Sequence, residues 1–557
     1  MSTAESFDYI VIGAGSAGCI VAARLAETRM GTVLLLETGA GEEQNPEILA
    51  ADGFKDAFAN DHTMHDRLSL PQGKLVKRPI YAGSGRGMGG SGSVNGTVYT
   101  RGDAQDFACW PSGWQWDDVV PAYEAVEQRL RVRFRQPTAL TERCIRAAES
   151  IGFTQKNSLN DGDLNGFIGY NDMNFEGELR RSSYVAFILD NAAAQLDLLT
   201  IRTHSTLQRI IFDDNKTAVA IEYCESGVTK QALIRREIIL CAGALETPKL
   251  LMLSGVGPQP ELAKFAIPPV LHVESIGKNL QDHPMVCLFY EGKQASDFGF
   301  PQLYGFHRFN TALSLPDTQA DTCLTLFAAA AVMRHTLHRM MPLMLLPQAL
   351  YRYRILRRAI RTAVDTAFKL PPLKNFVSRL YGVVVILGKP VSRGQLRLRS
   401  VNPSDSAHID LAYFAHADDL TTITAGIQQT LQMMQHPSMA EWGNKLVSTG
   451  AASSDEQTLQ KWIEKSVATS FHFAGTCTMG EADHAPVDSR LRLKGTRNVR
   501  VADASVIPEV PVSALNAPTM MIGYRAVEFI REDSLNRADA MNHSDISIEP
   551  TPLSCVQ

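Results

Sequence analysis

The chain has 557 residues, 45% of them hydrophobic and 20% charged, with a formal net charge of −5 at pH 7. These values are typical of a soluble globular protein of roughly three to four domain-sized units. The slightly acidic balance and the lack of a recognisable nucleic-acid-binding module argue against nucleic acid as a partner.

The chain carries no sign of disulfides, metal sites or membrane spans. Nine cysteines, an odd number without a CxxC pair, argue against a disulfide framework and a zinc site. No uninterrupted apolar stretch reaches the ~18 residues that cross a bilayer. The first eight residues carry acids and no basic, apolar leader. We therefore expect a cytoplasmic protein without a bound metal.

The first forty residues have the pattern of a dinucleotide-binding unit. The apolar run 9–12 leads into GAGSAG at 13–18, and a second apolar run, 32–36, ends at Glu37. In such a unit the glycines permit a tight turn, close approach to a pyrophosphate and helix–strand packing, and the helix N-terminus attracts the anion. Glu37 is placed to accept hydrogen bonds from a ribose. The pattern predicts a dinucleotide without distinguishing FAD from NAD.

A second glycine-dense segment, GSGRGMGGSGSVNG, covers residues 83–96. Each glycine costs conformational entropy when it is ordered, so this density indicates a loop whose backbone comes very close to another group. A flexible linker is the alternative, but the apolar residues Val98 and Tyr99 follow almost immediately.

Further candidate elements of the same domain are scattered along the chain. Residues 237–242 are typical of a buried strand, followed by a helix over 247–253 and a breaker cluster at 254–258. Residues 499–502 predict another short strand, and a helix is expected from about 518 to 530. We therefore predict an α/β fold with a discontinuous Rossmann-like nucleotide domain and other material inserted between its pieces.

One inserted segment, 333–379, is a basic amphipathic insertion. It holds ten Lys or Arg and a single acid, Asp365. Apolar residues recur at steps of three and four from Tyr353 to Phe368, which predicts one face of a helix. Such a helix favours peripheral contact with an anionic membrane, here the cytoplasmic face of the inner membrane. The alternative, equally open, is a solvated face whose apolar side packs on the core.

One histidine is the best candidate for a catalytic base. Oxidation of an alcohol by a flavin needs a base for the hydroxyl proton, and histidine suits this role because its ordinary pKa is about 6.5. His472 is followed by small residues that leave room for a ligand. Taken alone, however, a histidine between Phe471 and Phe473 is more often a core residue.

Four separated segments together resemble the glucose-methanol-choline (GMC) oxidoreductases, FAD enzymes of the alcohol dehydrogenase and oxidase type. The segments are GAGSAG with Glu37, the glycine-dense loop from Gly85 to Trp110, residues 243–258, and His472 with Asn516.

The resemblance, which runs from about Phe7 to Ile530, implies a Rossmann-like FAD-binding domain and an α+β substrate-binding domain on an antiparallel sheet. The FAD-binding domain is expected over 1–155, 198–290 and 475–535, the substrate-binding domain over 156–197 and 291–474, and a polar tail over 536–557.

The resemblance also implies roles for single residues. His472 is expected to be the catalytic base, and Asn516 its partner on the substrate oxygen, as suits choline-type and aliphatic-alcohol members. Val94 stands where certain relatives tether FAD through a histidine, so we expect non-covalent FAD. Asp282 and His283 are expected to be structural. The expected FAD contacts are Gly13, Gly15, Ser16, Gly18, Glu37, Gly87, Gly89, Asn95, Gly96, Leu207, Ala242, Asp503, Ala504 and Thr519.

The predicted reaction is oxidation of a primary alcohol to an aldehyde, with flavin N5 as hydride acceptor. The basic insertion favours a quinone-type electron acceptor, and an oxygen-using oxidase is the alternative. Choline is the main alternative substrate, and it needs an aromatic cage and an acid. A flavin-dependent cyanohydrin lyase and a light-driven fatty-acid decarboxylase are further alternatives. The candidate cage residues are Phe298, Phe300, Tyr304 and Phe306, with Asp297 and Asp317.

Overall fold

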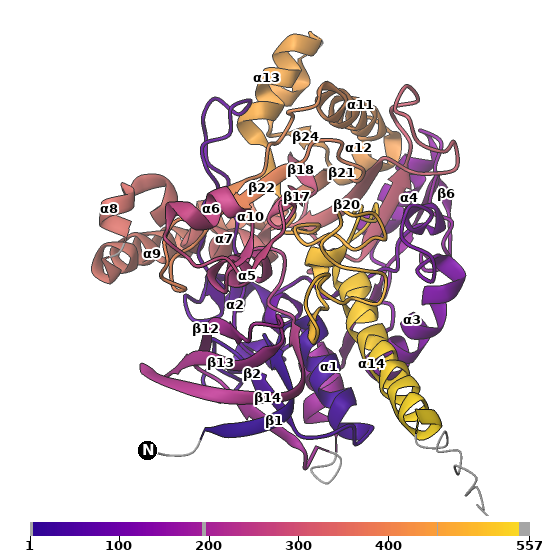
Figure 1. The fold of residues 1–557 in the computed structure, drawn as a ribbon. Helices are drawn as coiled ribbons and strands as arrows, with labels where there is room; N and C mark the ends of the chain where they lie inside the picture. Colours follow the sequence, from indigo (N-terminus) through magenta and orange to yellow (C-terminus); the bar gives the residue numbers. More distant parts are fainter. Residues whose placement is uncertain (1–3, 192–195, 352, 454, 545–557) are drawn as a thin grey trace, which may run out of the picture.

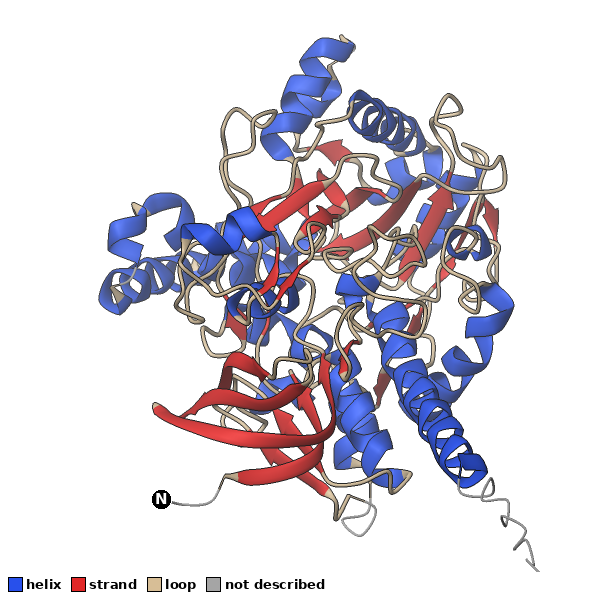
Figure 2. Ribbon diagram, in the orientation of Figure 1, coloured by secondary structure: helices blue, strands red, loops and turns tan. Residues whose placement is uncertain are grey.

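The computed structural model describes residues 4–191, 196–351, 353–453 and 455–544 (Figure 1). Two sheets lie one above the other in this view, with helices on their outer faces (Figure 2). One continuous cluster of buried apolar side chains extends through both. The predicted α/β class is therefore confirmed.

The lower sheet has the strand order β11-β2-β1-β14-β13-β12, with β26 added beside β14. Strands β1, β2, β11, β26 and the second half of β14 run parallel, as expected for a nucleotide-binding sheet with both faces covered. Strands β12 and β13 continue it in the antiparallel sense. The strands are β1 Glu5–Ile12, β2 Val33–Leu36, β11 Leu199–Arg202, β12 Ser205–Phe212, β13 Ala218–Glu225, β14 Val228–Leu240 and β26 Val499–Val501.

Long-range pairing confirms that this sheet is discontinuous in sequence. Strand β26 pairs with the end of β14 through Ile238–Val499 and Leu240–Val501. Beside the sheet, helix α1 (Ser16–Glu27) packs against α14 (Asn516–Ser544). The expected helix near the C-terminus is therefore longer than predicted, because residues 536–544 of the proposed tail are helical, while 545–557 lie outside the described residues.

The upper sheet is almost wholly antiparallel, with the order β24-β18-β21-β20-β19-β7-β6 and β25 beside β18. Its core strand β21 is buried at every position, which explains the unbroken apolar run of its sequence. The strands are β6 Thr154–Gln155, β7 Phe167–Tyr170, β18 Pro284–Glu291, β19 Leu303–His307, β20 Thr322–Ala328, β21 Leu380–Leu387, β24 Lys445–Leu446 and β25 Ala468–Thr469.

The division into an FAD-binding and a substrate-binding domain stays a proposal, and the strand pairing bears on its boundaries. The sequence boundary at residue 290 assigned β18 to the first domain, whereas β18 pairs with β21 in the upper sheet. The boundary at residue 155 likewise separates β6 from its partner β7. These pairings favour boundaries just before β6 and just before β18.

The basic insertion forms a helical subdomain between β20 and β21, which are themselves paired. The helix expected over 353–368 is present as α9, and the segments before and after it form further helices. Helices α8 and α9 stand at the outer edge of the molecule, at the left of Figure 1. The four helices are α7 Ala329–Leu345, α8 Gln348–Tyr351, α9 Arg354–Lys369 and α10 Pro371–Arg379.

Shorter elements complete the described part of the chain. The remaining helices are α2 Phe54–Ala59, α3 Trp116–Leu130, α4 Ala139–Glu149, α5 Thr247–Leu253, α6 Gln259–Lys264, α11 Ala417–Met433, α12 Pro437–Trp442 and α13 Glu456–Ser466. Single turns are η1 Pro46–Leu49, η2 Gly90–Ser93, η3 Ala104–Phe107, η4 Val185–Leu189, η6 Thr449–Ala452 and η7 Ala504–Val506. Small strand groups are β3 Met64–His65 with β4 Ser84–Gly85, β5 Val98–Tyr99 with β8 Asp172–Met173, β9 Phe175–Glu176 with β10 Leu179–Arg180, β15 Val256–Gly257 with β16 Leu271–His272, and β17 Lys278–Leu280 with β22 Gly394–Arg397 and β23 His408–Asp410.

No helix in the described part of the chain is both long and apolar enough to cross a bilayer. The described cysteines are all free thiols, and most of them are buried.

Candidate functional site

The turn between β1 and α1 has the geometry that its glycines predict. Gly13 has φ +97°, and a Cβ there would lie 2.7 Å from the carbonyl oxygen of Cys241. A Cβ on Gly18 would lie 1.8 Å from the carbonyl oxygen of Gly13, so the helix packs directly on the turn. Among the described residues no side chain caps α1 at Gly15, so its N-terminus can meet an anion.

Glu37 joins the two glycine-rich segments. Its Oε2 accepts a hydrogen bond from Ala14 N at 2.9 Å, and its Oε1 accepts from Gly39 N at 2.8 Å and Gly87 N at 2.9 Å. Burial raises the pKa of this carboxyl, against the opposing effect of the backbone donors. The acid at the end of β2 therefore fixes the loop around Gly87 against the nucleotide turn.

The second glycine-rich loop lies directly on the first. Gly89 has φ +84° and donates its N–H to Ala14 O at 2.7 Å. A Cβ on Gly90 would lie 2.8 Å from Gly15 Cα, and a Cβ on Gly92 would lie 2.7 Å from Ser16 Oγ. Larger residues do not fit at these points, so the glycine density reflects close approach of two backbones.

Arg180, which sequence reasoning missed, holds the far end of this loop. Its guanidinium donates to Asn95 Oδ1 and Asn95 O at 2.8 Å and to Gly92 O at 3.2 Å. The side chain is fully buried, and burial lowers its pKa to about 9. The sequence carried no signal for this contact, because a single arginine in a short strand has no recognisable pattern.

The segment after β14 is tied to the end of β26 by a carboxylate. Asp503 Oδ2 accepts from Gly243 N at 2.8 Å and from Thr247 Oγ1 at 2.6 Å, and burial raises the pKa of this group. Ala242 lies against the nucleotide turn, because its Cα would be 3.0 Å from a Cβ on Gly13. Ala504 O accepts the N–H of Gly475, which links this end to the segment that carries His472.

The remaining residues expected to contact FAD lie in other elements. We call the two glycine-rich segments, Glu37 and the segments bound to them the cradle. Leu207 is buried on β12, and Ser205 of that strand donates its N–H to Glu37 O at 2.8 Å. A Cβ on Gly96 would lie 3.0 Å from Pro301 Cγ, at the side of the upper sheet. Thr519 donates its hydroxyl to Leu515 O at 2.7 Å within the first turn of α14.

His472 follows β25 in a strained turn. Phe471 has φ +64°, a conformation that bulky residues rarely adopt and that occurs mainly where a fold over-determines it. The N–H of His472 is held by Asp282 Oδ1 at 2.7 Å, and Thr469 Oγ1 accepts the N–H of Phe471 at 2.7 Å. Desolvation lowers the pKa of His472 to about 4, so the imidazole is neutral at pH 7.

The ring of His472 is held by a second histidine. His472 Nδ1 lies 2.9 Å from His283 Nδ1 and 3.1 Å from Ser470 Oγ. His472 Nε2 makes no hydrogen bond to any described residue, which leaves it for a ligand. His283 is fully buried, and desolvation lowers its pKa well below the ordinary value. The two residues expected to be structural, Asp282 and His283, thus contact His472 directly.

Asp282 anchors this group of residues. Its Oδ2 accepts hydrogen bonds from the hydroxyls of Tyr413 and Thr469, while its Oδ1 accepts from His472 N. Burial raises the pKa of Asp282 to about 6. The interaction could not be read from the sequence, because Asp282 and His472 are 190 residues apart.

Asn516 lies at the nucleotide turn. Its Oδ1 accepts a hydrogen bond from Ser16 Oγ at 2.7 Å, and no hydrogen bond among the described residues joins it to His472. Its Nδ2 is buried and lacks a partner in the described part of the chain. A buried amide with unused donors marks a place where an acceptor group of a ligand fits.

These residues fit a dinucleotide cofactor. A free helix N-terminus, glycines that bring two backbones into contact, and the unpaired Nδ2 of Asn516 surround one turn. The described residues include no group of three or more His, Cys, Asp or Glu that could hold a metal ion. The fold and these residues together are those of a dinucleotide-binding protein.

The chain belongs to the GMC oxidoreductase family. Family models described as GMC oxidoreductase match residues 7–285 and 390–523. An oxygen-dependent choline dehydrogenase from Escherichia coli is 31% identical over 566 residues, covering 96% of this chain and 97% of the relative. FAD is the cofactor of this family.

Solved structures support the fold. Pyridoxine 4-oxidase from Mesorbium loti has a TM-score of 0.80 at 24% identity and covers 94% of this chain and 98% of its own. A formate oxidase from Aspergillus oryzae RIB40, studied for its FAD modification, has a TM-score of 0.82 at 22% identity and covers 96% and 100%.

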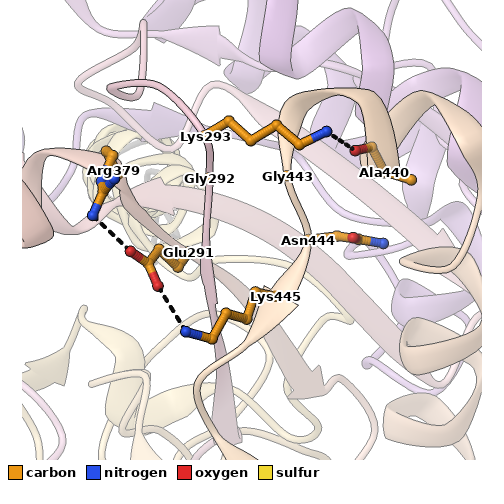
Figure 3. A pocket seen from close by; sticks show the side chains of 8 residues that line it. All are labelled: Glu291, Gly292, Lys293, Arg379, Ala440, Gly443, Asn444 and Lys445. Atoms are coloured by element: carbon orange, nitrogen blue, oxygen red, sulfur yellow. Dashed lines mark hydrogen bonds and ion pairs between the residues drawn. The ribbon is translucent and has the colours of Figure 1, made fainter.

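A separate surface pocket of about 350 Å³ lies at the far end of β18 (Figure 3). Glu291 bridges Arg379 at 2.7 Å and Lys445 at 3.3 Å, and Lys293 donates to Ala440 O at 3.0 Å. Strand β18 separates the pocket from His283 by roughly seven strand residues of about 3.3 Å each. The pocket is therefore distinct from the candidate site.

Proposed function

We propose that this chain catalyses the FAD-dependent oxidation of a primary alcohol to an aldehyde. The observation that carries the proposal is the state of His472, a neutral imidazole with Nδ1 fixed and Nε2 free. A group in this state accepts the hydroxyl proton of an alcohol that lies within hydrogen-bond reach.

The proposed tautomer follows from Ser470. Its hydroxyl donates to His283 O at 2.8 Å, so Ser470 Oγ, 3.1 Å from His472 Nδ1, is an acceptor toward that ring nitrogen. His472 then carries its proton on Nδ1, with His283 Nδ1 at 2.9 Å as a second acceptor, and presents an unprotonated Nε2. In this arrangement His283 is a positioning residue, and His472 is the catalytic base.

We also propose roles in cofactor binding for residues of the cradle. When bound, FAD supplies the hydride acceptor of the reaction. The turn at Gly13–Gly18 and Glu37 would hold the dinucleotide, and Asn516 would donate its unpaired Nδ2 to the cofactor or the substrate oxygen. Val94 stands in the glycine-rich loop without a nucleophilic side-chain atom, which supports non-covalent binding.

The proposed electron acceptor is a quinone-type molecule, and oxygen is the alternative. The basic insertion supports a position at a membrane surface, where quinones reside. Oxygen is favoured by the similar choline dehydrogenases, whose names describe them as oxygen-dependent. Comparing reoxidation of the reduced protein by oxygen and by a soluble quinone distinguishes the two.

Choline is the second candidate substrate, because the 31% identical relatives are choline dehydrogenases. The cage expected from the sequence has little support. Arg135 already stacks 3.3 Å from the centroid of the Phe300 ring, and Asp317 is fully exposed beside Arg308. We therefore favour an uncharged primary alcohol over a quaternary ammonium alcohol.

The test is anaerobic bleaching of the flavin absorbance in the dark, with straight-chain alcohols, aromatic alcohols and choline. We expect rapid bleaching by at least one uncharged alcohol and a loss of about 10²–10⁴-fold in rate for His472→Ala. The matched control is His484→Ala, which replaces an exposed histidine in a turn and should leave the rate of bleaching unchanged. Bleaching by none of the alcohols, or an undiminished rate in His472→Ala, contradicts the proposal. Preferential bleaching by choline establishes the second candidate.

A further inference from the structure

We propose that the outer tip of the helical insertion, residues 344–351 and 353–358, is a docking surface for an anionic lipid bilayer. This docking tip comprises the end of α7, all of α8 and the start of α9. The inference rests on the proposed function only where it says what docking is for, namely access to alcohols and quinones in the membrane. The docking itself does not depend on which substrate is oxidised.

Large apolar side chains are concentrated in the docking tip. Met344 and Ile355 are 73% and 83% exposed, and exposed large apolar side chains gathered in one segment indicate an interaction surface. The tip is at the outer edge of the molecule, where α8 and α9 project away from both sheets (Figure 1). The exposed large apolar residues of the tip are Met344, Leu345, Leu350, Tyr353, Ile355 and Leu356.

The charge around these side chains is positive. The tip contains no acid, and Arg354 and Arg358 are exposed and form no ion pair with a described residue. Lys369 and Lys374, further along α9 and α10, are exposed as well. Apolar side chains flanked by exposed cations match an anionic bilayer, in which the chains enter the interface and the cations meet lipid phosphates. This complementarity makes lipid a better occupant than an acidic or neutral protein face.

The inner face of the insertion is fixed to the body of the protein. Arg339 of α7 is fully buried and donates to Asp66 at 2.5 Å and to Phe58 O at 2.9 Å. Arg357 and Arg361 of α9 pair with Asp61 at 3.0 and 2.6 Å. Most of the basic residues near the core are therefore neutralised, and the free cations are those on the outside.

The predicted apolar face of α9 is divided between the two alternatives that the sequence left open. Its second half packs on the protein, since Val364 is buried and Phe368 packs in a cluster with Val377 and Leu380. Its first residues, Tyr353 and Leu356, are exposed and belong to the docking tip.

A chain of contacts connects the docking tip to the catalytic base. Tyr351 of α8 donates to Asp66 Oδ2 at 2.9 Å, and Tyr81 donates to Asp66 Oδ1 at 2.8 Å. The ring of Tyr81 lies 6.1 Å from that of Phe471, which precedes His472 and is 38% exposed. Docking through the tip would therefore bring the Phe471 side of the site close to the lipid surface.

The experiment is cosedimentation of the FAD-loaded protein with vesicles, measured without substrate. One set of vesicles is phosphatidylcholine, and the other contains one quarter phosphatidylglycerol. We expect binding to the anionic vesicles at low ionic strength and at least tenfold weaker partitioning in Met344→Ser/Ile355→Ser and in Arg354→Glu/Arg358→Glu. Val401→Ser/Leu535→Ser, which alters two residues that are 57% and 58% exposed elsewhere, is the matched control with unchanged partitioning.

Activity and docking are measured separately. Oxidation of a soluble alcohol with a dye acceptor should be equal in all three variants, so a failed activity assay bears on the proposed function and not on docking. Absence of binding at low ionic strength, or equal partitioning of wild type and tip variants, overturns the proposal. So does a dimer in light scattering that dissociates in Met344→Ser/Ile355→Ser, because the tip would then cover a second copy of the chain.

Discussion

At the scale of single residues, the site depends on a histidine whose protonation is set by its surroundings. As the proposed base, His472 can accept a proton only when it is unprotonated, and desolvation lowers its pKa to about 4. We therefore expect the rate of flavin reduction to be constant from pH 7 upward and to fall steeply only as the pH drops through about 4. Protonation of Asp282, whose pKa is about 6 and which holds His472 N, should add a shallower decrease near that pH. Stopped-flow reduction from about pH 3 to about pH 9 covers both steps, and a single steep step at or above about pH 6.5 contradicts the assignment.

His283 provides the second test at this scale. His283→Leu removes the acceptor at Nδ1 that fixes the ring of His472, so we expect flavin reduction to slow by about tenfold or more. His283→Asn retains an acceptor oxygen close to that position and should recover most of the rate. Both variants should hold FAD as the wild type does. Equal rates in Leu and Asn variants would mean that His283 only fills space.

Arg180 should stabilise the cofactor loop. Replacing it with Met leaves the carbonyl oxygens of Gly92 and Asn95 without this donor, which costs about 1–3 kcal/mol for a buried polar group. We expect a lower melting temperature and weaker retention of FAD, measured by thermal unfolding and by flavin release in dilute urea. Arg209→Met is the matched control, because Arg209 is 58% exposed and pairs with Glu222 at the surface. Equal losses in both variants would count against the loop-anchoring role.

At the scale of elements, the close packing of α1 on α14 determines the shape of the cradle. A Cβ on Gly523 would lie 2.8 Å from Ala17 Cα, so Gly523→Ala must separate the two helices. Since α1 begins at the nucleotide turn and α14 begins at Asn516, we expect weaker FAD binding and a loss of about 1–3 kcal/mol in unfolding free energy. Gly73→Ala, where an added Cβ meets nothing within 4 Å, is the control. Calorimetry and FAD titration measure the two effects.

The elements that the sequence predicted are those whose signal is local. Turn, helix and acid around Gly13–Glu37 follow one another within forty residues, so spacing alone located them. The helix at 247–253 and the strand at 499–501 were also readable, because breakers and apolar runs delimit them. The contact between His283 and His472, and that between Ser16 and Asn516, join residues far apart in sequence. No single-sequence periodicity encodes such pairs, because they arise only when the two sheets pack together.

At the scale of the whole molecule, Arg339 is the fully buried member of the group of side chains that fix the basic insertion to the body. It pairs with Asp66 and Asp61, which are about one-quarter exposed. Replacing Arg339 with Met removes one cation from each carboxylate, whereas Asp61 keeps its pairs with Arg357 and Arg361 and Asp66 keeps two tyrosine hydroxyls. We expect a cost of about 1–3 kcal/mol, because the groups that lose Arg339 are only partly compensated. The substitution should weaken the packing of α7 against the end of α2, because Arg339 also donates to Phe58 O and Asn60 O.

We therefore expect Arg339→Met to loosen the insertion without unfolding the two sheets. Hydrogen exchange of residues 329–379 should become at least fivefold faster, while the amides of β1 and β21 keep their protection. The ring centroids of Phe58 and Phe471 are 6.0 Å apart, and Phe471 precedes His472. A displaced Phe58 should therefore also lower kcat/KM for the alcohol, with a smaller change in FAD binding. Arg334→Met, at a half-exposed arginine 3.7 Å from Asp365, is the control and should leave exchange unchanged. Faster exchange throughout the molecule in Arg339→Met would mean that the arginine stabilises the whole fold and is no local anchor of the insertion.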